Sequence, residues 1–391
     1  MSFSIEKDKG YAVPVARIGV IGGGQLGLML ARASQRLGCS CVILDPLSDS
    51  PAAQAAGQQI VGGYSDPDKV RELAESCDII TFELEDLDVK PLLELEKEGV
   101  AIQPTPRVLA TVQDKLTQKT FLRDAGIPTS NFIETPHPDE QVFADFGYPL
   151  VQKARRGGYD GRGVCVMKTA ADYEKNLPVA SLIEKFVEAE KEISVLVARN
   201  PDGECKAYPV VEMVFVEGQN VLDVLLAPAR INDGIAAEAQ QLGIKTVEAL
   251  EGVGIFGVEM FLTKDGRLLV NEVAPRTHNS GHQSIEANVT DQFEQHVRAI
   301  LNMPLGETEQ LSPAAMVNLL GEPGFEGRPV IRGMNETLAI AGVSVHLYGK
   351  AVTKPYRKMG HVTVLDKDIQ KALDKAEEVK QAFAIEGEHR L

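Results

Sequence analysis

The sequence predicts an α/β domain at the N-terminus followed by two α+β segments. Strands and amphipathic helices alternate over about the first 100 residues, which is the pattern of a parallel βαβ sheet. Further on, a glycine-rich loop at 155–163 separates two strand-like runs, and the remainder is rich in strands. We therefore expect three domains, at residues 1–113, 114–187 and 188–391.

Each N-terminal element has a local signal. Residues 16–23 form an apolar strand that ends in glycines, and residues 25–38 place apolar side chains at helical spacing. A second apolar strand follows at 39–45. The pattern then repeats, with a helix that begins at Asp66-Pro67 and a strand at 78–83. This repetition predicts a parallel sheet covered by helices.

The two later segments have a different pattern, in which strands predominate. A connecting helix ends at Gly126, with Pro128 just beyond, which is a stop signal. The expected strands of the central segment are 147–154, 164–168 and 181–187. Those of the C-terminal segment are 192–199, 207–216, 255–262 and 267–274, followed by a compact piece and a charged terminal helix.

Composition restricts the class of protein. The chain of 391 residues has 40 basic against 56 acidic residues, a net charge of −16, which argues against a nucleic acid or an anionic membrane as partner. No run reaches the roughly 18 apolar residues of a membrane helix. The five cysteines form no CxxC pair, so we expect no disulfide framework and no zinc site. We expect a cytoplasmic protein.

The glycines at 22–27 fit G-x-G-x-x-G between a strand and a helix, and Asp45 ends the next strand. This is the pattern of a dinucleotide site. Its physical content is only close approach of an anion to N–H groups at a helix N-terminus, which any phosphate can use. A tight βα turn would also need glycine. Nothing downstream supplies dehydrogenase chemistry, and we predict that NAD does not bind here.

An opposed pair of carboxylates gives the sharpest local prediction. A two-residue turn at Asp265-Gly266 would close a hairpin over 257–276. Counting back from that turn places Glu259 opposite Glu272, within strands that are otherwise apolar. Asn271 is expected on the other face because side chains alternate along a strand.

Like charges directly opposed are unfavourable unless something lies between them. A hard divalent cation resolves this, and Mg²⁺ fits best because it takes few protein carboxylates plus phosphate oxygens of ATP. The plain alternative is two solvent-facing glutamates on an exposed sheet face. We favour the metal interpretation.

Four further segments are candidates for binding anions or nucleotide. The loop 155–163 holds four glycines and three arginines, enough to fold over phosphates, although a solvated hairpin tip is the alternative. Arginine, histidine and asparagine crowd 274–282, directly after the predicted metal strand, where a polar capping loop is the alternative. The basic cluster at 350–358 suggests an anion site or a solvated loop, and 184–187 gives a weak signal for an adenine edge.

Taken in order, these segments resemble the ATP-grasp superfamily, and within it the N5-carboxyaminoimidazole ribonucleotide synthetase family. The resemblance covers nearly the whole chain, from Ile18 to about Leu365. The motifs GGYDGRG and APRTHNSGH are the specific ones. The others are IGGGQLG, TFELEDLD, QDKLTQK, EKFVEAEKEISV, YPVVE and KPYRKMGH.

The resemblance implies an ATP-grasp fold, with an N-terminal Rossmann-like domain and ATP held between a small mobile central domain and a larger C-terminal one. It also implies that ATP, bicarbonate and aminoimidazole ribonucleotide give the N5-carboxylated ribonucleotide, ADP and phosphate in purine biosynthesis. Mg²⁺, which Mn²⁺ can replace, would bind Glu259 and Glu272. The expected partners are these small molecules and a second copy in a homodimer. We also expect a functional link to a downstream carboxylase or mutase, and we expect this chain to end before such a domain.

Residue roles follow at the matching positions. The residues expected to bind ATP are Lys115, Lys153, Glu184, Lys185, Val187, Glu192 and, in addition, Asn271. Those expected to be catalytic are Tyr159, Asp160, Arg162, Arg276, His278 and Asn279. Those expected to bind the ribonucleotide are Gln25, Leu26, Glu83 or Glu85, Lys350 and Arg357.

The chain departs from the family pattern at Met213–Phe215, where many relatives have an Asn/His pair, so the pattern does not define the floor of the ATP pocket. The nearest rivals are other ATP-grasp enzymes, such as a formate-dependent glycinamide ribonucleotide transformylase or a biotin carboxylase. A silent scaffold is the rival from another class, and the intact Glu259/Glu272 and Lys115/Lys153 pairs argue against it.

Overall fold

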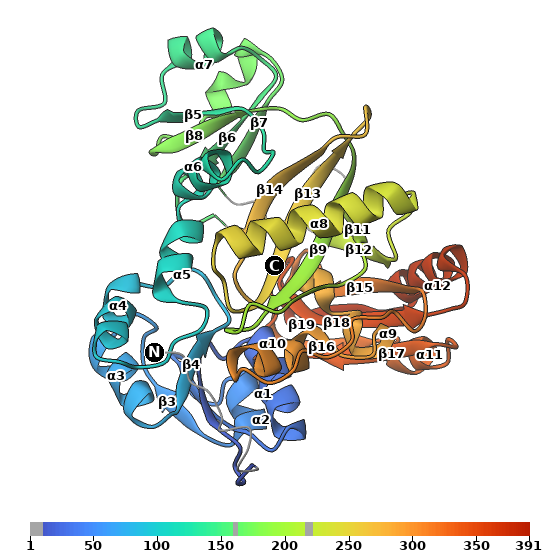
Figure 1. Ribbon diagram of the computed structural model, residues 1–391. Coiled ribbons are helices and arrows are strands. Elements are labelled where there is room, and N and C mark those ends of the chain that lie inside the picture. The colour runs from blue at the N-terminus through green and yellow to red at the C-terminus, as the bar shows by residue number, and fades with distance from the viewer. Residues whose placement is uncertain (1–10, 159–162, 216–221) are drawn as a thin grey trace.

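The computed structural model describes residues 11–158, 163–215 and 222–391. Across these residues the strands form four sheets. Figure 1 shows three regions along the chain: an N-terminal α/β region, a small antiparallel sheet that stands apart from it, and a large sheet that continues to the C-terminus. No helix within the described ranges is both long and apolar enough to cross a membrane.

The N-terminal sheet is parallel, with the order β3-β2-β1-β4, as the alternating pattern predicted. Its strands are β1 (Arg17–Ile21), β2 (Ser40–Asp45), β3 (Gln59–Val61) and β4 (Ile79–Phe82). Its helices are α1 (Gln25–Arg36), α2 (Pro51–Ala56), α3 (Pro67–Glu75), α4 (Val89–Lys97) and α5 (Pro106–Gln113). Asp66 accepts hydrogen bonds from two backbone N–H groups and so caps α3, as expected. The glycine turn after β1 and the acidic segment after β4 both lie at the carboxyl ends of these two neighbouring parallel strands.

The central region is an antiparallel sheet in the order β5-β8-β6-β7. Its elements are α6 (Lys115–Asp124), β5 (Phe132–Thr135), α7 (Glu140–Phe146), β6 (Leu150–Ala154), β7 (Val164–Met167), the 3-10 helix η2 (Ala170–Lys175) and β8 (Ser181–Lys185). The glycine loop joins β6 to β7. Asp114 caps α6 and pairs with Arg155, at 2.7 Å between Oδ2 and Nη2, so the base of the loop is tied to the start of α6.

The large sheet has the order β14-β13-β9-β11-β12-β15-β18-β17, with β10 added to β9. Its strands are β9 (Ala189–Arg199), β10 (Cys205–Ala207), β11 (Val211–Phe215), β12 (Leu222–Ala227), β13 (Gly254–Thr263), β14 (Leu268–Ala274), β15 (Ala314–Leu320), β17 (Val343–Leu347) and β18 (Lys358–Leu365). The remaining elements are α8 (Asp233–Ala249), η3 (Asn279–Gly281), α9 (Ser284–Ala287), α10 (Gln292–Ile300), β16 (Phe325–Arg332), α11 (Met334–Leu338), α12 (Ile369–Ala382) and β19 (Ala384–Arg390). β16 and β19 pair separately.

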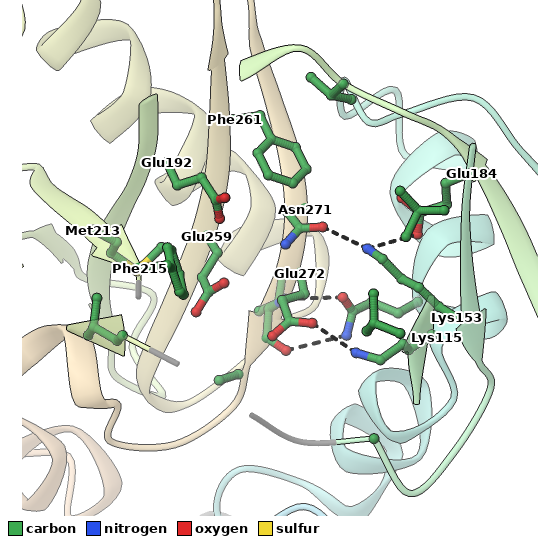
Figure 2. Close-up of a pocket in the computed structure, with 18 of the residues that line it drawn as sticks. Lys115, Lys153, Glu184, Glu192, Met213, Phe215, Glu259, Phe261, Asn271 and Glu272 are labelled. Atoms are coloured by element: carbon green, nitrogen blue, oxygen red, sulfur yellow. Dashed lines mark hydrogen bonds and ion pairs between the residues drawn. The ribbon is translucent and has the colours of Figure 1, made fainter. Parts of the chain in front are cut away.

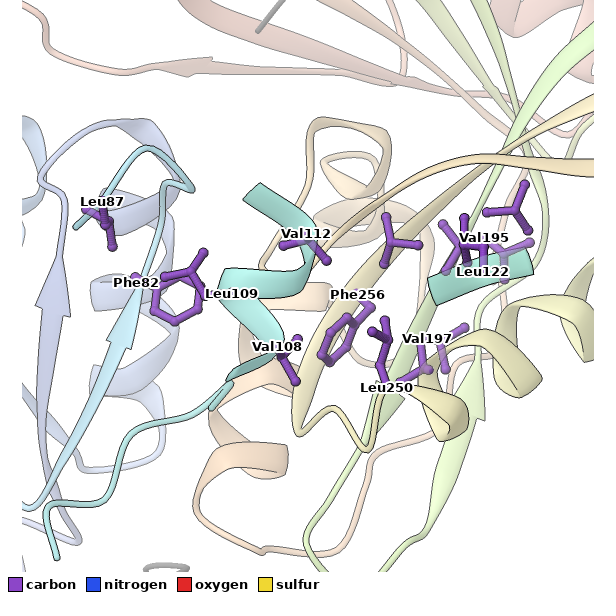
Figure 3. Packing of buried hydrophobic residues seen from close by; sticks show 14 of the residues in the cluster. Phe82, Leu87, Val108, Leu109, Val112, Leu122, Val195, Val197, Leu250 and Phe256 are labelled. Carbon is purple, nitrogen blue, oxygen red and sulfur yellow. The ribbon is translucent and has the colours of Figure 1, made fainter. Parts of the chain in front are cut away.

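One apolar core joins the N-terminal region to the large sheet. Helix α5 carries Val108 and Leu109 into this core, where both are at most 4% exposed. Figure 3 shows them between Phe82, at the end of β4, and Phe256 on β13. Because burial of such side chains contributes about 1.5–3 kcal/mol each, this contact fixes the edge of the parallel sheet against the hairpin of β13 and β14.

A buried histidine strengthens the same junction. His296, on α10, is 1% exposed. Its Nδ1 accepts a hydrogen bond from the Ile255 backbone N–H at 3.1 Å, so in the neutral ring the proton lies on Nε2, which is 2.9 Å from Thr81 Oγ1. The Cβ of any residue larger than Gly254 would lie 2.9 Å from this ring. His296 thus connects β4 to β13 as a neutral imidazole.

We expect this imidazole to make folding sensitive to acid. Burial lowers the pKa of His296 to about 4, below its ordinary value of 6.5. The unfolded chain therefore takes up the proton first, so the stabilising contribution is complete above about pH 6.5 and is lost as the pH falls towards 4. Between pH 7 and 4.5 the free energy of unfolding should fall by about 2 kcal/mol more in the wild type than in His296→Gln, which keeps an acceptor and a donor but does not titrate. Urea unfolding at several pH values measures this difference in the free energy of unfolding. The same dependence on pH in the two proteins would contradict the prediction.

Candidate active site

Two adjoining cavities lie where the three regions meet. The first, of about 470 Å³, lies between the small sheet and the hairpin of β13 and β14 (Figure 2). The second, of about 440 Å³, lies between the N-terminal region and the loop after β14. Both are lined by Glu85, Val112, Lys115, Gly158, Arg276, His278, Asn279 and Lys358. Molecules bound in the two cavities would therefore lie on either side of this shared border.

The predicted pairing of Glu259 with Glu272 is confirmed. The expected two-residue turn is wrong, however. Residues 264–266 form a three-residue loop closed by a hydrogen bond from the Thr263 N–H to the Arg267 carbonyl, with Gly266 at φ +80°. This loop moves the pairing by one residue, so that Leu262 faces Leu268.

A β-bulge then restores the predicted register. The partner of Met260 is Val270, whereas the partner of Glu259 is Glu272, so Asn271 is the extra residue. Val270 and Val273 both point into the apolar core, and the two residues between them share the opposite face. The expectation that Asn271 lies on the other face is therefore wrong, because the bulge interrupts the alternation of side chains.

The carboxylates of this hairpin form an acidic wall in the first cavity (Figure 2). Burial and the nearby Glu272 and Glu192 raise the pKa of Glu259. Lys115 holds the pKa of Glu272 low, because its Nζ donates to Glu272 Oε2 at 2.8 Å. One carboxylate of the pair thus has a cationic partner and the other is crowded by like charges, which is the situation that a bound divalent cation would relieve.

Opposite this wall lie Lys153 and Glu184 of the small sheet. The Lys153 ammonium donates to Asn271 Oδ1 at 2.9 Å and lies 3.1 Å from Glu184 Oε1. Burial would raise the pKa of Glu184, but Lys153 and Lys119 lower it to about 2. Lys185, Val187 and Glu192 line the same cavity, so all seven residues expected to bind ATP border it.

The loop after β14 brings three predicted catalytic residues to the border of both cavities. Arg276 Nη2 lies 2.9 Å from Glu85 Oε1, which links the loop to the N-terminal region. His278 Nδ1 accepts from the Ser280 N–H at 3.3 Å, and its Nε2 lies 3.4 Å from Glu259 Oε1.

The amide of Asn279 is buried. Among the described residues neither its Oδ1 nor its Nδ2 has a hydrogen-bond partner. An unsatisfied buried amide is costly, so this side chain is suited to a polar ligand.

The N-terminal glycine loop binds a carboxylate of the protein itself. Glu83 accepts hydrogen bonds from the N–H groups of Gly24 and Gly27 at the start of α1. A Cβ at Gly22 would lie 2.4 Å from Glu83 Cγ, so the glycine makes room for this side chain. Asp45 accepts from the Gly23 N–H at 2.8 Å and from the Tyr64 hydroxyl at 2.9 Å. The features that suggest a dinucleotide site thus serve internal contacts.

We accordingly expect NAD and NADP to bind more weakly than about 1 mM. A pyrophosphate would have to displace the Glu83 carboxylate from the helix N-terminus, and Asp45 is already engaged. Isothermal titration with NAD, with ADP as the positive control on the same sample, measures this. Micromolar NAD binding would show that Glu83 moves aside and that the site is a dinucleotide site.

The predicted ribonucleotide residues are only partly brought together. Gln25, Leu26, Glu83 and Glu85 line the second cavity. Glu83 is engaged by α1, whereas Glu85 lies on the border of both cavities.

The basic residues near the C-terminus lie less centrally. Arg357 Nη1 donates to the Val352 carbonyl of its own loop, and Lys350 Nζ donates to the Lys358 carbonyl. Neither residue lines a cavity described above, but Lys358, which belongs to the basic cluster predicted at 350–358, lines both.

Three predicted catalytic residues, Tyr159, Asp160 and Arg162, lie outside the described residues. Sequence reasoning did not define the apolar floor of the first cavity, to which Met213, Phe215 and Phe261 contribute (Figure 2). It also missed Lys119 behind Glu184, at 3.2 Å between Nζ and Oε2. Its position one turn after Lys115 was a usable signal, because the two lysines lie on one face of α6.

Comparison with known proteins identifies the family. Residues 15–113 match the ribonucleotide synthetase preATP-grasp domain, 120–293 the ATP-grasp domain, and 314–375 the phosphoribosylaminoimidazole carboxylase C-terminal domain. The N5-carboxyaminoimidazole ribonucleotide synthase of Synechococcus elongatus is 41% identical over 360 residues, which cover 90% of each chain. The chain belongs to the N5-carboxyaminoimidazole ribonucleotide synthase family. The resemblance seen in the sequence is therefore confirmed.

Solved structures of this synthase family share the fold. The enzyme from Thermotoga maritima superposes with a TM-score of 0.90 at 49% identity, covering 95% of this chain and 100% of its own. That from Aspergillus clavatus, in complex with ADP and 5-aminoimidazole ribonucleotide, gives 0.86 at 34% identity and covers 94% and 98%. The chain spans 64% of the phosphoribosylaminoimidazole carboxylase of Schizosaccharomyces pombe, which is 40% identical. The predicted ATP-grasp fold is confirmed, and the domain boundaries at 113 and 187 stay predictions.

Proposed function

We propose that this protein carboxylates 5-aminoimidazole ribonucleotide with bicarbonate, at the expense of ATP, in de novo purine biosynthesis. The observation that supports this most directly is the pair of cavities with a shared border. One offers lysines and carboxylates suited to a metal–nucleotide, the other offers the N-terminal domain surface, and the border holds Arg276, His278 and Asn279. Family membership supports the same reaction over the rival ATP-grasp chemistries.

The residues of the first cavity would neutralise phosphate charge. Lys115 and Lys153 can each turn from a carboxylate partner towards an ATP phosphate, and the purine would lie against the apolar floor near Val187. Attack of bicarbonate on the γ-phosphate then gives carboxyphosphate and ADP. Catalysis of this step is mainly stabilisation of the charge that develops on the phosphoryl oxygens.

In the second step the substrate amine attacks the carboxyl carbon of carboxyphosphate. The N–C bond forms as the C–O bond to phosphate breaks, and inorganic phosphate leaves and takes up the amine proton. The border residues would assist this step. Arg276, held by Glu85, offers donors to an anionic carboxyl group. The amide of Asn279 offers a donor and an acceptor that no other described residue uses. His278, protonated at Nε2 when neutral, can donate a hydrogen bond that orients the same group. We propose that Glu85, at the border, rather than Glu83 faces the reacting part of the ribonucleotide.

We also propose that Glu259 and Glu272 hold Mg²⁺. The residues fit this ion, because two opposed carboxylates with Asn271 beside them supply the hard oxygen donors that it prefers. When bound, the ion would neutralise phosphate charge as a Lewis acid.

The reaction is tested by measuring ADP and carboxylated ribonucleotide together. We expect ADP release that depends on bicarbonate, Mg²⁺ and aminoimidazole ribonucleotide, with equal amounts of the two products. Formyl transfer to glycinamide ribonucleotide, or ADP release that aminoimidazole ribonucleotide does not change, would overturn the proposal.

A further inference from the structure

A buried lysine lies behind the first cavity. Lys119, on α6, is 2% exposed and lines neither cavity. Its Nζ lies 2.7 Å from Thr129 Oγ1, 3.0 Å from Ser130 Oγ and 3.2 Å from Glu184 Oε2. An ammonium has three donors, and these three oxygens satisfy them.

The hydroxyl groups around Lys119 have a fixed direction. Thr129 Oγ1 donates to the Val270 carbonyl at 2.7 Å, and Ser130 Oγ donates to Glu184 Oε2 at 2.6 Å. Both hydroxyl protons therefore point away from Lys119, which must supply a proton to each contact. This network needs the charged ammonium, and it engages Glu184 Oε2 from the side away from the cavity.

The other oxygen of Glu184 faces a second lysine. Lys153 Nζ lies 3.1 Å from Glu184 Oε1 and also donates to Asn271. The side chains of Glu184, Lys119 and Lys153 are 3%, 3% and 10% exposed. Two buried ammonium groups thus share one carboxylate, and one positive charge is left over on the side that faces the cavity.

We infer that Lys119 is a positioning residue for nucleotide binding: it shares the charge of Glu184 and so leaves the Lys153 ammonium available to phosphate. This inference rests on the proposed function, in which the first cavity binds ATP. Without Lys119, Glu184 would be buried with Lys153 as its main cation. Separating that pair to bind a phosphate would leave a buried carboxylate with no cation, which is strongly unfavourable.

If Lys119 acts through Lys153, removing Lys119 should lower the affinity for nucleotide only while Lys153 is present. Titration of the full chain with Mg-ADP should show affinity lowered by about 10-fold in Lys119→Met and in Lys119→Gln, which keeps a donor for Ser130. Lys153→Met should lose on the order of 30-fold, and Lys119→Met/Lys153→Met should bind no more weakly than Lys153→Met alone. Lys119→Arg, which restores the charge, should lie within about threefold of the wild type.

The control is Lys245→Met, which removes an exposed lysine that bonds a backbone carbonyl outside the cavities, and circular dichroism verifies the fold of every variant. Losses that multiply in the double variant would show that Lys119 does not act through Lys153. Unchanged ADP affinity in Lys119→Gln would reduce Lys119 to a structural role. If the wild type itself binds no ADP, the proposed function fails instead.

Discussion

Glu272→Gln should lower ADP formation by a factor on the order of 10³ while the protein stays folded. Glu272 is opposed to Glu259, and its Oε2 accepts from Lys115 at 2.8 Å. The substitution keeps the shape of the side chain but removes one of two charges proposed to hold Mg²⁺, and it deprives Lys115 of its anion. The side chain keeps 40% of its surface open towards the cavity, so the loss of charge is not expected to disturb the core.

Steady-state ADP release over a range of Mg²⁺ concentrations measures this effect. Glu188→Gln is the matched control, because Glu188 is 73% exposed and pairs at 3.5 Å with Lys264 at the tip of the same hairpin. It should behave as the wild type. Near-normal turnover of Glu272→Gln at limiting Mg²⁺ would remove this carboxylate from the metal site.

The pairing of Glu259 with Glu272 was predicted correctly from the sequence only because two local deviations from the expected hairpin cancel. The three-residue loop at 264–266 moves the register one way, and the bulge at Asn271 moves it back. Turn propensity favoured Asp-Gly as a two-residue turn, and no local signal marked the bulge. The prediction from strand alternation therefore placed Asn271, the extra residue of the bulge, on the wrong face of the sheet.

The glycine motif shows a different limit of sequence reasoning. The motif is typical of a loop that binds a phosphate at a helix N-terminus, but the anion that the structure shows at the start of α1 is the Glu83 carboxylate, 59 residues from Gly24. Lys119 was missed for a related reason, because a lysine in a polar helix is usually exposed. In both cases the partner comes from a distant part of the chain, and the packing of α6 and of the segment after β4 against their neighbours is needed to identify it.

Deletion of Asn271 should leave the fold intact and lower ADP formation on the order of 10²-fold. Without the bulge, the register set by the three-residue loop runs on unbroken. Glu272 then takes the place of Asn271 and still faces Glu259, while Val273 keeps its place in the core. What is lost is the oxygen that accepts from Lys153 at 2.9 Å, together with the local twist that directs Glu272 towards Lys115.

Deletion of Val270 is the matched control, because it shortens the strand equally and also leaves Glu272 opposite Glu259. It moves Asn271 into the position of Val270, which is fully buried in the apolar core. An amide without partners there, plus the lost apolar contacts, should destabilise the protein by about 3 kcal/mol, measured by urea unfolding. If the two deletions destabilise the protein equally, the bulge supports the fold itself. If only the Val270 deletion destabilises the protein, the bulge is an insertion that the sheet tolerates, and the role of Asn271 is to accept the hydrogen bond from Lys153.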